Sequence, residues 1–148
     1  MKSIVDALIV IALSVLYLVG LVELFAYSAR IDFPWQPYLG KPAWEVYTLL
    51  GLQGLMSILI VASVVAAGVA LRFSRHVFWY GLMVAVPITL DSAWDLSKVL
   101  AIQPMSAGHW WLHIEQFLVR LFVPAILASA FARFLSSHGL KPAARSAA

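Results

Sequence analysis

Ionisable side chains gather where two strongly apolar stretches of the chain meet, between Thr89 and Phe122. They are Asp91, Asp95 and Lys98 before a short connection, and His109, His113, Glu115 and Arg120 after it. Charges inside a membrane helix are costly, so they usually face a partner or a cavity. A buried carboxyl group that stays protonated can act as a general acid. We therefore expect the functional side chains of this protein in these two stretches.

The composition indicates an integral membrane protein. Of the 148 residues, 63% are hydrophobic and only 11% are charged, far from the balance of a soluble domain. Four apolar windows come near or exceed the roughly 20 residues that cross a bilayer, and they cover residues 4–28, 46–72, 76–101 and 109–135. The sequence predicts an all-α bundle of four transmembrane helices, followed by a polar, disordered cytoplasmic tail at 136–148.

The first window starts close to Met1, yet Glu23, Phe25 and Tyr27 stand where the small-residue cleavage site of a signal peptide belongs. We expect a retained helix.

Basic residues favour one side of the membrane in this topology, with Lys2, Arg72, Arg75, Arg133, Lys141 and Arg145 against Arg30, Lys41 and Lys98. By the positive-inside rule both termini are cytoplasmic. The expected location is a multi-pass position in a membrane, the inner membrane if the source is a bacterium.

The chain has no cysteine, which excludes disulfides, thiolate metal sites and cysteine nucleophiles. Its formal net charge of +3 comes mostly from loop residues. This charge is a topology signal, and it gives no reason to expect nucleic acid as a partner.

The polar residues of the last two windows recur at helical spacing, so each set shares one face. The two sets are Asp91, Asp95 and Lys98, and then His109, His113, Gln116 and Arg120. Counting inward from the connection places Asp91 level with Arg120, near the middle of a hydrocarbon core about 30 Å thick. We predict an intramembrane ion pair between these two residues, unless a neighbouring subunit supplies the partner.

Together these residues can build a pocket for an apolar ligand that carries a polar group. In this hypothesis Glu23 or Glu115 is the acid, and Asp95 orients the ligand or stabilises positive charge. The other candidate ligand contacts are Gln53, Asp91, Trp94, His113, Gln116 and Arg120. Tryptophan faces attract cations, so the set suits a double-bond isomerase or a receptor for an amphipathic amine or sterol. The same polar residues can instead serve only to fix the packing of the helices.

Two further features leave alternatives open. The segment with Trp35, Tyr38, Trp44 and Tyr47 contains three prolines, and it is either an interfacial segment or a lid over the pocket. His109 and His113, at i and i+4, resemble part of a two-histidine, carboxylate metal site that Asp95 or Glu115 could complete. This spacing is a weak signal, and haem held by both histidines is disfavoured because they share a helix. We assign no metal and no cofactor.

Three segments carry a resemblance to a known family: KPAW at 41–44, WDLSK at 94–98 and FLVRLFVPAIL at 117–127. In order and content they resemble the EXPERA, or emopamil-binding, family of four-helix membrane proteins, which includes sterol isomerases and the sigma-2 receptor. The resemblance implies a pocket lined by Glu23, by Asp91 or Asp95, and by Glu115 or Gln116. The family's glutamate in the second helix has only Gln53 as a counterpart here, and its histidine motif in the first helix is absent. The resemblance therefore implies ligand binding more than isomerisation.

A different class of function fits the same features. A small accessory subunit of a larger redox, photosynthetic or transport complex also consists of short-looped membrane helices. Such a subunit turns polar or small side chains outward to its neighbours, whereas a pocket protein turns its charges inward. The expected partners are the membrane itself and a lipid or apolar small molecule for the pocket hypothesis, or further copies or other subunits for the alternative.

Overall fold

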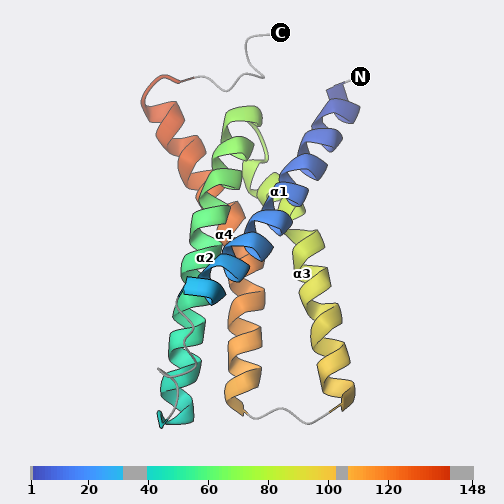
Figure 1. Cartoon of the computed structure of the whole chain (residues 1–148). Helices are drawn as coiled ribbons and strands as arrows, with labels where there is room; N and C mark the ends of the chain where they lie inside the picture. The colour runs from blue at the N-terminus through green and yellow to red at the C-terminus, as the bar shows by residue number, and fades with distance from the viewer. Residues whose placement is uncertain (1, 32–39, 103–106, 141–148) are drawn as a thin grey trace.

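The computed structural model describes residues 2–31, 40–102 and 107–140, which form a bundle of α-helices (Figure 1). The helices are α1 (Lys2–Ile31), α2 (Ala43–Arg72), α3 (Val77–Ile102) and α4 (Ala107–Ser137). Each is long and apolar enough to cross a membrane. The predicted four-helix membrane bundle is confirmed, and the helix ends lie within a few residues of the predicted windows.

The helix ends correct two of the predicted boundaries. Helix α4 continues to Ser137, into the predicted tail, of which residues 141–148 lie outside the described part of the chain. Helix α2 begins directly after Pro42, whose carbonyl accepts hydrogen bonds from the backbone N–H groups of Glu45 and Val46. Proline is tolerated there because the first helical turn has no use for its missing N–H.

Consequently, part of the segment predicted to be either interfacial or a lid is helical. Trp44 and Tyr47 belong to the first two turns of α2, whereas Trp35 and Tyr38 lie outside the described residues.

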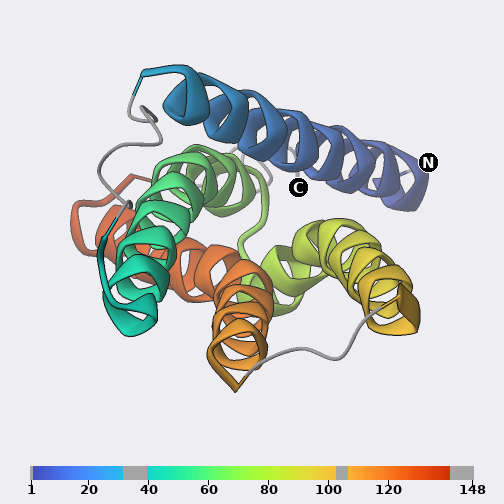
Figure 2. The same cartoon turned by 60° about the horizontal axis from the view of Figure 1, so that its bottom comes forward.

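The helices run alternately up and down. The start of α1, the turn from α2 to α3 and the end of α4 lie at one end of the bundle (Figure 1), which we call the terminal half. The start of α2, the end of α3 and the start of α4 form the opposite, distal half. Helix α4 packs along α2 and α3, while α1 crosses obliquely over α2 and α3 (Figure 2). The start of α1 and the end of α4 therefore lie on the same side of the membrane. That this side is the cytoplasmic one stays a prediction.

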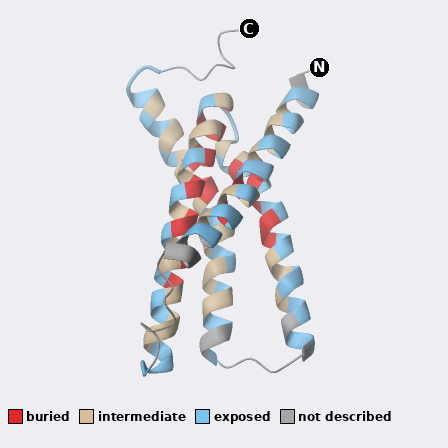
Figure 3. Ribbon diagram, viewed as in Figure 1, coloured by how far each residue is buried: buried red, intermediate tan, exposed pale blue. Residues whose placement is uncertain are grey.

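Tight packing is concentrated in the terminal half (Figure 3). The buried residues there are mostly small or β-branched, among them Val65, Ala66, Val69 and Ala70 of α2, Val84 and Ala85 of α3, and Ala125 and Ala128 of α4. A Cβ on Gly81 would lie 2.5 Å from the Cα of Ala125. The backbones of α3 and α4 thus approach as closely as small residues permit in membrane helices.

An ion pair, a ring stack and a tight turn hold the helices together at the terminal end. Arg72, at the end of α2, forms an ion pair of 2.7 Å with Asp6 near the start of α1. The rings of Phe73 and Tyr80 stack with their centroids 3.8 Å apart across the α2–α3 turn. His76 holds a φ of 55° in this turn, a left-handed conformation that reverses the chain within a few residues.

The distal half is more open. From Leu90 to the end of α3, and from the start of α4 to Val123, none of the side chains that the structure describes is buried. The polar residues predicted to be functional lie in these two stretches.

We expect Gly81→Ala to destabilise the bundle by about 1–3 kcal/mol, because the added methyl group meets backbone atoms that cannot move aside. Thermal denaturation in detergent measures this loss. Gly68→Ala is the control, since its Cβ would meet the Cδ2 atom of Leu13 at 3.0 Å, and that side chain can rotate. Equal midpoints for the two variants would contradict the proposed backbone contact.

Candidate functional site

A cleft of about 290 Å³ opens in the distal half between α1, α3 and α4. We call it the polar cleft. Its polar residues are Asp91, Ser92 and Asp95 from α3, and His113, Gln116 and Arg120 from α4. Its apolar residues are Leu18, Leu21 and Val22 from α1, with Ile88 and Leu96 from α3. The cleft therefore pairs a hydrocarbon wall with a polar wall, within helices that span the membrane.

A second cavity, of about 180 Å³, lies beside the polar cleft between α3 and α4. It shares Ser92, His113, Gln116 and Arg120 with the cleft. These side chains form the polar layer between α3 and α4, at the level where tight packing gives way to open space.

Arg120 holds this layer together. Its guanidinium group donates one hydrogen bond to the Ser92 hydroxyl, at 2.5 Å, and another to the Gln116 Oε1 atom, at 3.2 Å. The Nε atom of Arg120 is buried and has no hydrogen-bond partner within the described residues. Gln116 is in turn seated on α2, because a Cβ on Gly54 would lie 2.8 Å from its Nε2 atom.

The predicted direct ion pair between Asp91 and Arg120 is wrong. Among the described residues, ion pairs join Lys41 to Glu45, Asp6 to Arg72 and Asp95 to Lys98. Asp91 lines the same cleft as Arg120 and interacts with it electrostatically at longer range. Counting from the connection predicted the depth correctly, but neighbouring positions on a helix point about 100° apart. The contact is made by Ser92, one position further along.

A backbone interruption explains why Tyr17 is fully buried beside this layer. Pro124 has no N–H group, so the carbonyl of Arg120, four residues earlier, loses its helical partner. The hydroxyl of Tyr17 in α1 donates a hydrogen bond to that carbonyl, at 3.1 Å. This bond joins α1 to α4 at the gap that the proline leaves. No pattern in the sequence predicted Tyr17 as the partner of the carbonyl that Pro124 leaves free.

The two carboxylates of α3 differ in their contacts. Asp95 accepts a hydrogen bond of 3.0 Å from Lys98. Asp91 has neither a hydrogen bond nor an ion pair with any described residue. Trp94, predicted to contact a ligand, is 64% exposed and lies outside the cleft, with the Lys98 ammonium 5.5 Å from its ring centroid.

The three predicted catalytic carboxylates are not brought together. Asp95 lines the polar cleft, whereas Glu115 lines a separate groove between α2 and α4. Glu23 is exposed on α1 and lines neither. Gln53 is half-buried on α2, has an interaction partner and does not line the cleft.

Of the two predicted histidines, the structure describes the side chain of one. His113 lines the polar cleft, and the side chain of His109 lies outside the described part of the structure. Within the described residues, no group of three His, Asp or Glu side chains is placed to hold a metal ion.

We expect Tyr17→Phe to cost about 0.5–2 kcal/mol, because it leaves the Arg120 carbonyl without a partner inside the membrane. In a Pro124→Ala background the restored N–H group satisfies that carbonyl, so the same substitution should cost less. A double-mutant cycle of unfolding free energies in detergent measures the difference. An identical cost of Tyr17→Phe in both backgrounds would show that the two residues act independently.

Comparison with protein-family models, with curated proteins and with solved structures gave no match. The resemblance to the EXPERA family therefore stays a hypothesis, and function has to be argued from the geometry of the bundle.

Proposed function

We propose that the polar cleft binds an uncharged amphipathic molecule of the isoprenoid alcohol or sterol class, taken up from the membrane. The apolar wall of Leu18, Leu21 and Val22 suits the hydrocarbon part of such a molecule, which can extend through the open side of the cleft. The opposite wall supplies hydrogen-bond acceptors and donors for its polar group. In this proposal both termini are cytoplasmic, so the cleft opens in the half of the membrane away from the cytoplasm.

Charge balance supports an uncharged ligand. The carboxylate of Asp95 is paired with Lys98, and Asp91 lies close enough to Arg120 for the two opposite charges to interact. A charged ligand would upset this balance, because either its own charge or the charge of one of these side chains would have no opposite charge beside it in a poorly solvated site. A hydroxyl group makes a hydrogen bond without changing the balance.

The observation that carries the proposal is the position of Asp91. Its carboxylate lines the cleft beside an apolar wall, and it has neither a hydrogen bond nor an ion pair with a described residue. A carboxylate in this position is an acceptor for a ligand hydroxyl, and hydrogen bonds to a charged group are the stronger kind.

We propose binding rather than isomerisation as the main role. A double-bond isomerase needs an acid in contact with the reacting carbon, and the two residues predicted to be that acid, Glu23 and Glu115, do not line the cleft. His113 and Asp95 are the cleft residues that could move a proton if the ligand were also a substrate.

We expect Asp91→Leu to weaken binding of a long-chain isoprenoid alcohol about tenfold to a hundredfold, the equivalent of one charge-assisted hydrogen bond. Equilibrium binding of geranylgeraniol to the purified protein measures this, and the matching hydrocarbon without the hydroxyl should bind far more weakly. Glu23→Leu is the control, because it makes a similar change outside the cleft. The proposal would be overturned if Glu23→Leu lost binding while Asp91→Leu kept it. It would also be overturned if the parent protein bound the alcohol and the hydrocarbon equally.

A role as accessory subunit is a second candidate, and Glu23 is the observation that favours it. This carboxylate lies in the span Ile4–Leu24, is exposed, and has no hydrogen bond or ion pair with a described residue. An exposed charge inside a membrane span is costly unless another molecule meets it. We propose that any neighbouring subunit contacts α1 at this point.

Because the chain has no cysteine, a single introduced thiol is a unique attachment point for a cross-linker. We expect Val19→Cys, which lies one turn before Glu23 on the same exposed face of α1 and keeps the carboxylate, to give a cross-linked product with a second polypeptide in native membranes. Ile60→Cys, on the exposed face of α2, should give none. Products of the same mass and yield from both positions would indicate random encounters and would contradict a specific contact at α1.

A further inference from the structure

The largest of the cavities described lies outside the polar cleft. It is an open groove of about 760 Å³ between the first turns of α2 and the first turns of α4. We call it the aromatic groove, because Trp44 and Tyr47 line it from α2 and Trp111 lines it from α4. Glu115, one turn further along α4, also lines it. None of these residues lines the polar cleft, so the two cavities are separate.

Glu115 lies against the backbone of α2. A Cβ on Gly51 would be 3.2 Å from its Oε2 atom and 3.7 Å from its Oε1 atom, so the carboxylate occupies the space that a side chain on α2 would take. It is half-buried. Unlike Glu45 and Asp95, which pair with lysines, Glu115 has neither a hydrogen bond nor an ion pair with a described residue. Within the described residues, no basic side chain therefore pairs with this carboxylate.

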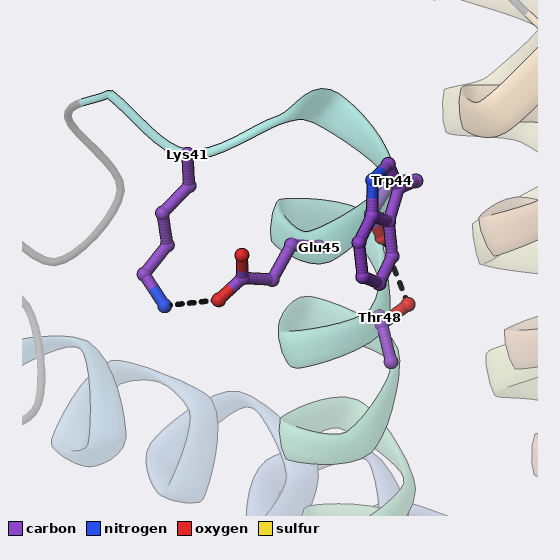
Figure 4. Close-up of polar contacts among 4 residues, drawn as sticks. All are labelled: Lys41, Trp44, Glu45 and Thr48. Atoms are coloured by element: carbon purple, nitrogen blue, oxygen red, sulfur yellow. Dashed lines mark hydrogen bonds and ion pairs between the residues drawn. The ribbon is translucent and has the colours of Figure 1, made fainter.

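Two of the aromatic side chains of the groove are available to a ligand. Trp44 and Trp111 are each 69% exposed. The Trp44 ring lies on one side of α2, while Glu45 points to the other side, toward Lys41 (Figure 4). The neighbouring Glu45 is thus paired outside the groove, and Glu115 is the carboxylate that lines the groove together with the two tryptophans. Aromatic faces and a carboxylate both attract a cation with carbon substituents.

The position of the groove points to a lipid headgroup as that cation. It lies at the distal end of the bundle, where α2 and α4 begin. Tryptophan and tyrosine at the ends of membrane spans lie at the depth of the lipid headgroups. Leu52, 54% exposed, continues the groove toward the middle of the membrane, where acyl chains lie.

We propose that the aromatic groove binds a membrane phospholipid through a primary ammonium headgroup. The ammonium group donates hydrogen bonds to the carboxylate of Glu115, and its carbon atoms lie against Trp44 and Trp111. A primary ammonium is the best match, because an unpartnered carboxylate accepts N–H donors. This site is independent of the ligand proposed for the polar cleft.

Binding of dioctanoylphosphatidylethanolamine, measured by native mass spectrometry of the full-length protein in a mild detergent, tests the proposal. Dioctanoylphosphatidylglycerol is the control lipid, since it has the same chains and no ammonium group. We expect the parent protein to bind the ethanolamine lipid at least tenfold more tightly than the glycerol lipid. Glu115→Gln should reduce this preference to less than twofold.

Glu45→Gln is the matched control, because it removes a carboxylate from the same end of the bundle but outside the groove. It should leave the preference unchanged. Trp111→Leu changes an exposed side chain and should weaken binding of the ethanolamine lipid about fivefold. This variant keeps the test valid if Glu115→Gln does not fold. Equal binding of both lipids to the parent, or equal losses in the Glu115 and Glu45 variants, would overturn the proposal.

Discussion

Hydrocarbon offers no hydrogen-bond partner to a backbone carbonyl, so the gap that Pro124 leaves in α4 must be closed by another part of the protein. Tyr17 closes it by donating its hydroxyl hydrogen to the carbonyl of Arg120. This bond ties α1 to α4 at the boundary between the two halves of the bundle. The guanidinium group of the same Arg120 ties α4 to α3 through Ser92. One residue thus links three helices, through its backbone on one side and its side chain on the other.

The two halves of the bundle differ because their side chains differ in size. In the terminal half, Gly81 and Ala125 allow α3 and α4 to touch through their backbones. On the distal side of Arg120, the residues that face each other from α3 and α4 are longer and polar, and these two helices no longer pack closely. Because the apolar environment provides little drive for helices to associate, close contact depends on such small residues. The open half can therefore hold cavities while the tight half maintains the fold.

The two cavities of the distal half differ in charge, and this difference separates their proposed ligands. The polar cleft contains acidic groups that are each near a base, which suits a neutral hydroxyl compound. The aromatic groove contains one acid that pairs with no base among the described residues, together with two exposed tryptophans, which suits an ammonium headgroup. Helix α4 contributes to both, with Gln116 and Arg120 lining the first and Glu115 the second. Neighbouring positions on one helix thereby serve two separate sites.

Composition and window length by themselves determined the number of helices and their approximate ends, and counting from the α3–α4 connection determined which residues of these helices lie level, because every residue of a helix adds the same rise. The placement of Arg120 level with the Asp91–Ser92 step is an example. Only the tertiary structure decided rotation, since glycine contacts on α2 and the Tyr17 bond set which side of α4 faces which neighbour. For this reason Ser92 replaced Asp91 as the partner of Arg120, and Glu23, Asp95 and Glu115 came to lie in three different places. Periodicity shows which residues share a helical face, but the identity of the facing helix depends on packing between segments that are far apart in the chain.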